Sequence, residues 1–357
     1  AAPHVEAGAR APVEPAMGTP EPGGAEPADR PAWLPAGYDP AARPALVLDL
    51  DNTLVHSAPA DARALPHCAK AEGDVRRFDL PIETGVGGLK LRYQVKLRAG
   101  LEAFLRRAHA AFQLAVYTHG SPAYTREILA ILDPDGRYFG GRVVARSPGQ
   151  QVLKRLPAIL PPERQHRAVV LDDREDVWDE QARACVVLVR PFFFFEVEQL
   201  PQMQPWSGME HMLYGDPEQD GQLARALDGP LRLVHEGLAR AGPGASVESI
   251  LPGARAALLA GVVLVFSGGI IYEARDARQH GLWRLAESLG AQCLLGWEDR
   301  VTHVVAPRAE TGTVRTALAK GAHAVSPQWL MDSAFAFCRA PEGRYALVAP
   351  AAARAAA

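Results

Sequence analysis

The sequence predicts an α/β protein built around a parallel sheet, and three observations support this fold. Short apolar runs such as ALVLDLD, LAVYT, AVVLDD and CVVLVR recur between positions 45 and 190. Stretches with helical periodicity, residues 99–110 and 121–132, lie between them. A second, shorter series of apolar runs and helical patterns follows from about position 246. Apolar strands that alternate with helices are typical of parallel sheets covered by helices.

Residues 58–97 interrupt the first alternation. They contain FDLPIET and LKLRYQVKL, two alternating segments around a Gly-rich turn. Such a pattern predicts an inserted β-hairpin beside the parallel sheet. A hairpin at this position would shape access to a ligand site.

The chain of 357 residues is long enough for two domains. Residues 1–43 are rich in Ala, Pro, Gly and Glu and are predicted to be disordered. The first domain is expected at 44–198, and a Pro-rich linker followed by a helix at 199–245. The second domain is expected at 246–349, and the Ala-rich tail at 350–357 carries no fold information.

Composition narrows the class of protein. A formal charge of -3 indicates no electrostatic footprint for nucleic acid, so direct nucleic-acid binding is not expected. The four cysteines form no CxxC pair, which argues against a zinc cluster or a disulfide framework. The longest apolar stretch, residues 256–266, is too short for a membrane span, and no signal peptide is recognisable. Because the chain begins with Ala, it can be a fragment.

Two aspartates follow the first apolar strand. Asp49 and Asp51 are two positions apart, so an extended backbone directs both side chains to one face. Crowded carboxylates repel each other, and a divalent cation, most suitably Mg²⁺, removes that repulsion. A single DxD can also simply cap a turn. Asp172 and Asp173 end another apolar strand in the same way, which favours the metal site.

These segments resemble a known superfamily. Asp49, Asp51 and Thr53 match motif one of the haloacid dehalogenase superfamily, DxDx[TV], and Thr118 after LAVYT resembles its motif two. The segment LDDREDVW is characteristic of FCP/SCP-type phosphatases, which dephosphorylate the C-terminal heptad repeats of RNA polymerase II. LRAGLEAFLRRA, YTHGSPAY and ILDPDGRYFGGRVVARS extend the resemblance over most of residues 45–195. Asn52 departs from the acidic residue common at its position.

The resemblance implies a mechanism and a set of site residues. Asp49 would attack phosphorus and form an aspartyl-phosphate, while Asp51 would protonate the leaving serine oxygen and then activate water. Asp49, Asp173 and the backbone carbonyl of Asp51 would bind Mg²⁺, and Asp172 would support these ligands from behind. The remaining implied contacts are hydroxyl donors to the phosphoryl group or to neighbouring carboxylates, namely Thr53 and Thr118.

The phosphate-binding lysine of motif three is ambiguous. In related enzymes it stands two residues before a Leu-x-x-Leu helix pattern, and QQVLKRLPAIL fits this in two registers. One register places Lys154 at the motif position, where it would neutralise phosphoryl charge. The other places Gln151 there, which would leave a degenerate pseudophosphatase. We favour Lys154. Arg98 and Arg146 are further phosphate candidates, each better explained as structural.

The second domain resembles a BRCT domain. The resemblance rests on VFSGG after the first strand, GW before VTHVV, TGTVRTALAKG at a helix start and VSPQWLMDS near the end. Trp329 is expected to be a buried anchor. In BRCT domains that bind phosphopeptides, a Ser or Thr, the next backbone amide and a Lys or Arg hold the phosphate, and Ser267, Gly268 and Arg315 match them. Many single BRCT domains bind proteins without phosphate.

These resemblances predict a nuclear, Mg²⁺-dependent serine/threonine phosphatase that acts on the phosphorylated C-terminal domain of RNA polymerase II. The BRCT domain would help to dock the polymerase or other transcription proteins. The main alternative is a scaffold in which a degenerate first domain retains only its fold and the BRCT domain binds phosphoproteins. A small-molecule phosphatase is a third possibility, disfavoured by the BRCT domain and the lack of a recognisable mobile cap.

Overall fold

The computed structural model describes residues 29–66, 68, 75–81, 90–146, 153–196, 221–271 and 276–347. Besides the predicted disordered segment 1–43, of which residues 1–28 are not described, three sequence predictions lie wholly or mostly outside these residues. They are the motif-three alternative Gln151, the Pro-rich linker that begins at 199 and the tail at 350–357.

Residues 29–43 pack against the first domain, although their composition predicts disorder. Leu34 is buried in the core, and Trp33 donates a hydrogen bond from Nε1 to Asp228 Oδ1 at 3.2 Å. The rings of Tyr38 and His235 lie 4.9 Å apart. These side chains supply buried area that Ala, Pro and Gly lack. A short 3₁₀ turn, η2 (Pro40–Ala42), then leads into the first strand.

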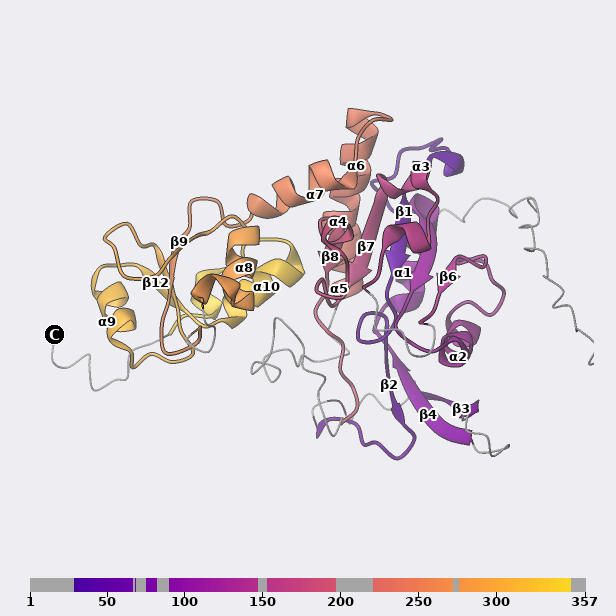
Figure 1. The fold of residues 1–357 in the computed structure, drawn as a ribbon, viewed down its shortest axis with the longest axis horizontal. Coiled ribbons are helices and arrows are strands. Elements are labelled where there is room, and N and C mark those ends of the chain that lie inside the picture. Colours follow the sequence, from indigo (N-terminus) through magenta and orange to yellow (C-terminus); the bar gives the residue numbers. More distant parts are fainter. Residues whose placement is uncertain are drawn as a thin grey trace, which may run out of the picture.

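The central sheet of the first domain is parallel, as the apolar runs predict (Figure 1). Within the described residues its strands lie in the order β6-β5-β1-β7-β8. The inner strands β1 and β7 are buried along their whole length, which explains their continuous apolar sequences. The strands are β1 (Ala45–Leu48), β5 (Gln113–Tyr117), β6 (Val143–Val144), β7 (Ala168–Asp172) and β8 (Val186–Leu188).

The predicted hairpin is present as part of a small antiparallel sheet. Its two strands are β3 (Val75–Pro81) and β4 (Lys90–Leu97). A strand that the sequence pattern did not predict, β2 (Val55–Pro59), pairs with the other edge of β4. Because β2 follows directly after the segment that carries Asp49 and Asp51, the small sheet lies beside the carboxyl end of β1.

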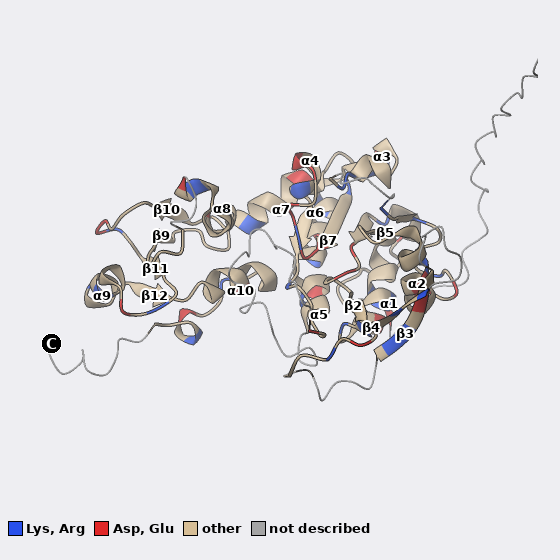
Figure 2. Ribbon diagram, turned by 60° about the horizontal axis from the view of Figure 1, so that its bottom comes forward, with Lys and Arg blue, Asp and Glu red and all other residues tan. Residues whose placement is uncertain are grey.

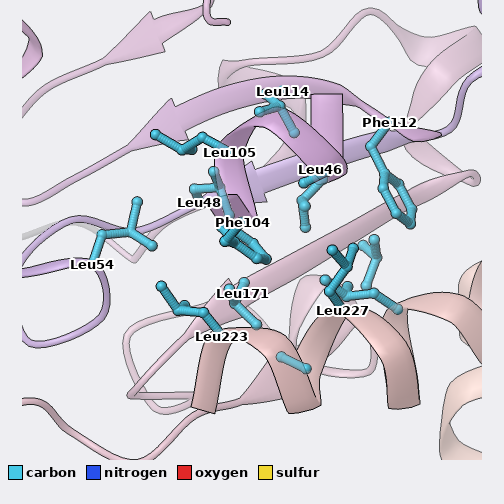
Figure 3. Close-up of a cluster of buried hydrophobic side chains, with 14 of the residues drawn as sticks. Leu46, Leu48, Leu54, Phe104, Leu105, Phe112, Leu114, Leu171, Leu223 and Leu227 are labelled. Carbon is cyan, nitrogen blue, oxygen red and sulfur yellow. The ribbon is translucent and has the colours of Figure 1, made fainter. Parts of the chain in front are cut away.

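Helices on one face of the parallel sheet form its larger core (Figure 3). Phe104 and Leu105 of α1 (Leu101–Ala111) pack with strand residues such as Leu171. Leu223 and Leu227 reach the same cluster from the helix that follows the linker. The predicted helix after the linker therefore helps to close the core of the first domain.

That helix contains a proline. It consists of α5 (Gln222–Ala226), a π-helical turn η6 (Leu227–Leu231) and α6 (Arg232–Ala241). Pro230 lies inside the π-helical turn, where the wider backbone accommodates its ring and its missing N–H. The next helix, α7 (Val247–Ala256), still contributes Val247 and Leu251 to the first core.

The remaining helical elements of the first domain are short, apart from α2. Ser121 caps α2 (Pro122–Leu132) by accepting a hydrogen bond from Tyr124 N, and Pro122 occupies its first turn. The described residues of the motif-three segment form a 3₁₀ turn, η4 (Leu156–Ala158), and Pro157 in that turn cannot continue an α-helix from the residues before it. The other elements are α3 (Pro162–Gln165) and α4 (Glu180–Arg183).

The second domain is a smaller α/β unit with its own parallel sheet. Among the described residues its strands lie in the order β10-β9-β11-β12, with bounds β9 (Val263–Phe266), β10 (Gln292–Leu294), β11 (His303–Val305) and β12 (His323–Val325). Its helices are α8 (Gly281–Ser288), α9 (Gly312–Ala319) and α10 (Gln328–Ala336), with 3₁₀ turns η7 (Ala277–Gln279) and η8 (Glu342–Arg344). The pattern agrees with the predicted BRCT-like fold.

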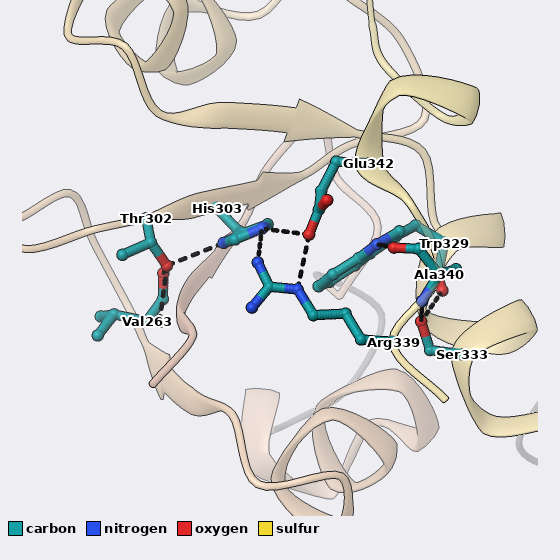
Figure 4. Close-up of polar contacts among 8 residues, drawn as sticks. All are labelled: Val263, Thr302, His303, Trp329, Ser333, Arg339, Ala340 and Glu342. Atoms are coloured by element: carbon teal, nitrogen blue, oxygen red, sulfur yellow. Dashed lines mark hydrogen bonds and ion pairs between the residues drawn. The ribbon is translucent and has the colours of Figure 1, made fainter. Parts of the chain in front are cut away.

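Trp329 is the buried anchor that the sequence predicts for this domain (Figure 4). Its Nε1 donates to Ala340 O at 2.8 Å, and its ring stacks on His303 at 4.9 Å. Burial lowers the pKa of His303 to about 4, so the stacked imidazole is neutral at physiological pH. Glu342 and Arg339 lie at the edge of that ring. These contacts show that Trp329 has a packing role in the core of this domain.

The two domains contact each other through α10 and the segment after β8. Arg190 forms an ion pair with Asp332, and its guanidinium lies 5.2 Å from the ring centroid of Phe335. Tyr345 donates to the other oxygen of Asp332 at 2.7 Å, and Gln222, at the start of α5, donates to Phe335 O.

Charged residues of both signs are interspersed over both domains (Figure 2). None of the described helices has the length and apolar character needed to cross a membrane.

Candidate active site

The catalytic candidates lie on a tight loop that follows β1. Asp49 continues the strand and donates its backbone N–H to Leu171 O of β7 at 3.0 Å. The chain then turns back, because Asn52 adopts a left-handed conformation with φ +61° and donates its N–H to Val55 O. Asn tolerates this conformation better than most residues, which accounts for its presence here. Leu50 and Leu54 anchor the loop in the core.

The segment after β8 packs against this loop and forms hydrogen bonds with it. Phe192 N donates to Asn52 O at 2.7 Å, and Asn52 Nδ2 donates to Phe192 O at 3.0 Å. His56 Nδ1 accepts from the backbone N–H groups of two further phenylalanines of this segment. Burial lowers the pKa of His56 to about 4, which keeps Nδ1 available as an acceptor. Arg98 donates to Thr53 O and Arg190 O, and its guanidinium lies 5.5 Å from the ring centroid of Phe192, so it links the loop to this segment.

Lys154 extends into the site from the motif-three segment. Its Nζ lies 2.6 Å from Asp49 Oδ1 and 2.8 Å from Asp172 Oδ2, and only 2% of its side chain is exposed. Burial lowers its pKa, but Asp172 and Asp49 raise it more, so Lys154 is charged. A bridge between the backbones of Lys154 and Trp178 fixes its position.

Asp172 is held by three donors. Lys154 and Trp178 Nε1 both donate to Oδ2, each at 2.8 Å, and the backbone N–H of Arg174 donates to Oδ1 at 2.9 Å. The Lys154 ammonium also lies 5.3 Å from the centroid of the fully buried Trp178 ring. Trp178 is thus a positioning residue for two charged groups. Its presence in LDDREDVW was the only sequence signal for this role.

Thr53 and Asp173 form a separate buried pair. Thr53 Oγ1 donates to Asp173 Oδ1 and accepts from Asp173 N, both at 3.0 Å. Thr53 is fully buried and does not line the pocket, so its observed contact is with the carboxylate. This arrangement fixes the direction in which Asp173 presents its other oxygen.

Asp51 turns away from the other carboxylates toward α2. Tyr124 donates its hydroxyl to Asp51 Oδ1 and lies 2.7 Å from Ser57 Oγ. The ring of Tyr124 lies so close to Gly120 that a Cβ there would be 2.6 Å from Tyr124 Cδ1. Sequence reasoning missed Tyr124, although it stands within YTHGSPAY.

A pocket of about 250 Å³ opens above these groups. Asp49, Asp51, Lys154, Asp172 and Asp173 all line it. Thr118 also reaches the pocket: its Oγ1 accepts from Gly120 N at 2.9 Å and so retains a hydrogen to donate inward. The remaining lining comes from the neighbouring loops, namely Asn52, His119, Gly120, Arg174 and Val177.

Asp49, Asp172 and Asp173 are arranged to hold a metal ion. One oxygen of each lies within 4.8 Å of the others, and all three are buried. Burial raises the pKa of Asp49, the Lys154 charge lowers it and the Asp172 charge raises it, and the result is a pKa of about 7. Burial and the neighbouring carboxylates also raise the pKa of Asp173 well above its usual range. A hard divalent cation would relieve this repulsion, and carboxylate oxygens are its preferred ligands. The residues therefore fit Mg²⁺.

In the second domain, the BRCT candidates gather at the start of α9. Ser267 Oγ donates to Thr311 Oγ1 at 3.0 Å, and Thr311 caps that helix. Arg315 lies on its first turns, exposed, with Nη1 bonded to Glu310 O. Gly268 has φ +73°, and a Cβ there would lie 2.9 Å from Pro307. The structure thus brings Ser267, Gly268 and Arg315 to one end of the domain.

The chain joins a parallel sheet, with paired aspartates at the ends of β1 and β7, to a BRCT-like unit. This combination defines a phosphatase-type domain that carries a BRCT domain. Comparison with known families agrees: residues 44–205 match the NLI interacting factor-like phosphatases, and residues 271–329 match the twin BRCT domain. Residues 44–205 are thus similar to the NLI interacting factor-like phosphatase family.

Similar proteins are named as RNA polymerase II C-terminal domain phosphatases. RNA polymerase II C-terminal domain phosphatase-like 4 of Arabidopsis thaliana is 29% identical over 315 residues, which cover 85% of this chain and 69% of that protein. An RNA polymerase II C-terminal domain phosphatase of Encephalitozoon cuniculi is 39% identical over 151 residues, 42% of this chain and 32% of that protein. The chain therefore spans only part of these relatives.

Solved structures of Fcp1 match both domains together. Fcp1, described as an essential RNA polymerase II CTD phosphatase, aligns with a TM-score of 0.67 and 26% identity over 86% of this chain and 96% of that chain. A fission yeast Fcp1 variant bound to beryllium fluoride aligns with a TM-score of 0.64 at the same identity and coverage. The predicted resemblance to FCP-type phosphatases with a BRCT domain is thus confirmed.

Proposed function

We propose that this protein is a Mg²⁺-dependent protein serine/threonine phosphatase that acts on the phosphorylated C-terminal domain of RNA polymerase II in the nucleus. One observation carries the proposal: buried Lys154 bonds both Asp49 and Asp172 at the floor of the pocket. A pseudophosphatase scaffold would not need a buried cation against the nucleophile. The relatives named for this activity support the choice of substrate.

In the proposed reaction Asp49 attacks phosphorus and the bond to the serine oxygen breaks. Asp51 delivers a proton to that oxygen, then removes a proton from the water that hydrolyses the aspartyl-phosphate. Lys154 and the Thr118 hydroxyl neutralise and orient the phosphoryl oxygens, which is most of what phosphoryl transfer requires. Thr53 holds Asp173 in place. Mg²⁺, held by Asp49, Asp173 and the backbone carbonyl of Asp51, would supply further charge neutralisation, and Asp172 would support it.

The direct test measures phosphate release from a phosphoserine heptad-repeat peptide with Mg²⁺ and after chelation. We expect hydrolysis only with the cation. An equal, negligible rate in both conditions, together with intact phosphopeptide binding, would instead favour the scaffold.

Metal binding should depend on pH with a defined sign. Because the pKa of Asp49 is raised to about 7, the stabilisation from its protonated form is complete below its unfolded pKa and lost as pH rises through about 7. Mg²⁺ needs the ionised form, so binding releases protons and tightens with rising pH. We expect Mg²⁺ to raise the thermal midpoint more at about pH 8 than at about pH 5.5. Equal increases in the thermal midpoint at the two pH values would contradict this expectation. Asp173→Asn should reduce the Mg²⁺-dependent increase at each pH.

Tyr124→Phe should impair catalysis without unfolding the protein. The substitution removes one hydroxyl, which donates to Asp51 and keeps its carboxylate on the α2 side of the pocket. Losing a hydrogen bond to a charged group should lower kcat by roughly tenfold or more. Ser57→Ala is the matched control, because it removes the other partner of Tyr124 and leaves the bond to Asp51. An unchanged kcat in Tyr124→Phe would exclude the positioning role.

We propose that the BRCT domain also binds phosphopeptides, through Ser267, Gly268 and Arg315. With vanadate occupying the catalytic pocket, Ser267→Ala and Arg315→Ala should each weaken phosphopeptide binding by about fivefold or more. Arg344→Ala is the control, since Arg344 is exposed and lies on η8 instead of α9. Wild-type affinity in both variants would remove this site.

A further inference from the structure

A second hollow lies at the opposite end of the parallel sheet from the catalytic pocket. Its volume is about 460 Å³, and it is formed by η2, by α3 and by the turn after α6. Arg43 precedes β1 and Arg167 directly precedes β7, whereas Asp49 and Asp173 follow the same two strands. In Figure 1, α3 and α6 lie at the upper end of this domain and β2 to β4 at the lower end.

The charged side chains that line this hollow are mostly cationic. Three arginines, Arg43, Arg164 and Arg167, line it together with His166, against one carboxylate, Glu163. A smaller hollow of about 270 Å³ adjoins this one and is also lined by Arg43 and Arg164. The concave shape concentrates positive potential, although the chain as a whole carries a formal charge of -3.

Two of the guanidinium groups keep most of their donors available. Arg164 Nη2 donates to Arg43 O at 2.7 Å, and Arg167 Nη1 donates to Gly242 O at 3.4 Å. In the part of the chain that the structure describes, neither group pairs with a carboxylate. Both side chains are half-buried, so their forks are partly fixed before any ligand arrives. Fixed guanidinium forks suit the tetrahedral oxygens of phosphate.

The rest of the hollow is apolar. Ala41 and Ala42 line one side, and Leu238, Ala239 and Pro243 line another. A ligand that matches both parts carries a phosphate beside small apolar groups, as a phosphoserine next to proline does. Nucleic acid would present a continuous row of phosphates to a hollow that offers only one cluster of cations.

We propose that this hollow is a second phosphate-binding site, which holds a phosphorylated, proline-containing repeat of the substrate chain while another repeat is dephosphorylated at Asp49. The inference rests on the proposed function for the substrate, but binding at the hollow is measurable without catalysis. The site would increase the local concentration of remaining phosphorylated repeats at the pocket.

The distance between the two sites sets the length of substrate that can use both. From Arg167 to Asp173 the chain advances six residues along β7, about 20 Å at strand spacing. A fully extended heptad spans about 23–25 Å, and the peptide must pass around the domain. One repeat is therefore too short, and we expect the second site to act only on peptides of several repeats.

The test uses the full chain with a single-repeat phosphopeptide, a four-repeat phosphopeptide and a small aryl phosphate. The double variant Arg164→Ala/Arg167→Ala should raise KM for the four-repeat peptide by about tenfold and leave kcat/KM for the other two substrates unchanged. Glu163→Gln, which removes the carboxylate from the hollow, should lower KM for the long peptide. Arg240→Ala is the control, because Arg240 is exposed on α6 and does not line the hollow.

Direct binding separates this proposal from the proposed function. In Asp49→Asn protein, the arginine double variant should lose about tenfold in affinity for the four-repeat peptide, whether or not wild type hydrolyses it. Retained aryl phosphate turnover and thermal midpoint establish that the double variant folds. The proposal is overturned if the long peptide keeps its wild-type KM and affinity, or if single-stranded RNA competes for the hollow better than the phosphopeptide does.

Discussion

Replacing Asp49 with asparagine is expected to abolish hydrolysis of both phosphopeptides and aryl phosphates. Asn has the same shape but is a far weaker nucleophile than a carboxylate, so no aspartyl-phosphate can form at this position. By analogy with the removal of other enzymatic nucleophiles, the rate should fall by at least about four orders of magnitude. Phosphate release with saturating Mg²⁺ is the measurement.

The loss should not result from unfolding. Lys154 keeps its second partner, Asp172, and the variant removes a carboxylate whose ionised form is disfavoured by burial. Without Mg²⁺ at about pH 8, the thermal midpoint of Asp49→Asn should therefore be no lower than that of wild type. Asp79→Asn, on the exposed strand β3, is the matched control and should retain full activity. Residual activity above about 1% of wild type would assign the nucleophile to another group.

The sheet of the first domain could be predicted because its strands are buried on both faces. β1 and β7 read as continuous apolar runs, and that signal is local. The strands β2, β10 and β12 were missed for the opposite reason. They are short and contain polar residues, and they are strands only because a neighbouring strand supplies hydrogen-bond partners.

The acidic part of the site was also predictable from local patterns. Asp49 and Asp51 follow one strand, and Asp172 and Asp173 lie at the end of another, so sheet topology alone brings three of the four together. Tyr124 was not predictable in this way, because its bond to Asp51 joins residues 73 positions apart and depends on how α2 packs. The left-handed Asn52 was visible in the sequence as an unusual residue, but its bonds to Phe192 were not.

The motif-three lysine shows why the sequence could favour the Lys154 register but could not establish it. In the residues of this segment that the structure describes, 153–160, the predicted helix pattern is absent and a 3₁₀ turn forms at Leu156–Ala158. Lys154 is directed into the pocket by a backbone bridge to Trp178, a long-range contact that no periodicity encodes. Its role in phosphate binding remains a proposal, and removing its charge is the strongest test.

Lys154→Met is expected to reduce both stability and activity. Methionine fills a similar volume but leaves Asp49 and Asp172 buried without their shared cation. Removing one partner from a buried ionic cluster should lower the free energy of unfolding by about 3–5 kcal/mol without Mg²⁺. Loss of a charge that faces the transferred phosphoryl group should lower kcat by roughly two to three orders of magnitude. Urea denaturation and phosphate release measure the two effects.

A second substitution separates the two roles of Lys154. Adding Asp172→Asn to Lys154→Met removes one of the uncompensated carboxylates, so stability should recover in part. Activity should not recover, because the phosphoryl group still lacks its cation. Arg155→Met controls for a neighbouring cation, since Arg155 is 60% exposed and lies 3.9 Å from Asp179. If Lys154→Met unfolds more easily but keeps its wild-type kcat, Lys154 is a structural counter-ion only, and the phosphate must be neutralised by other groups of the pocket.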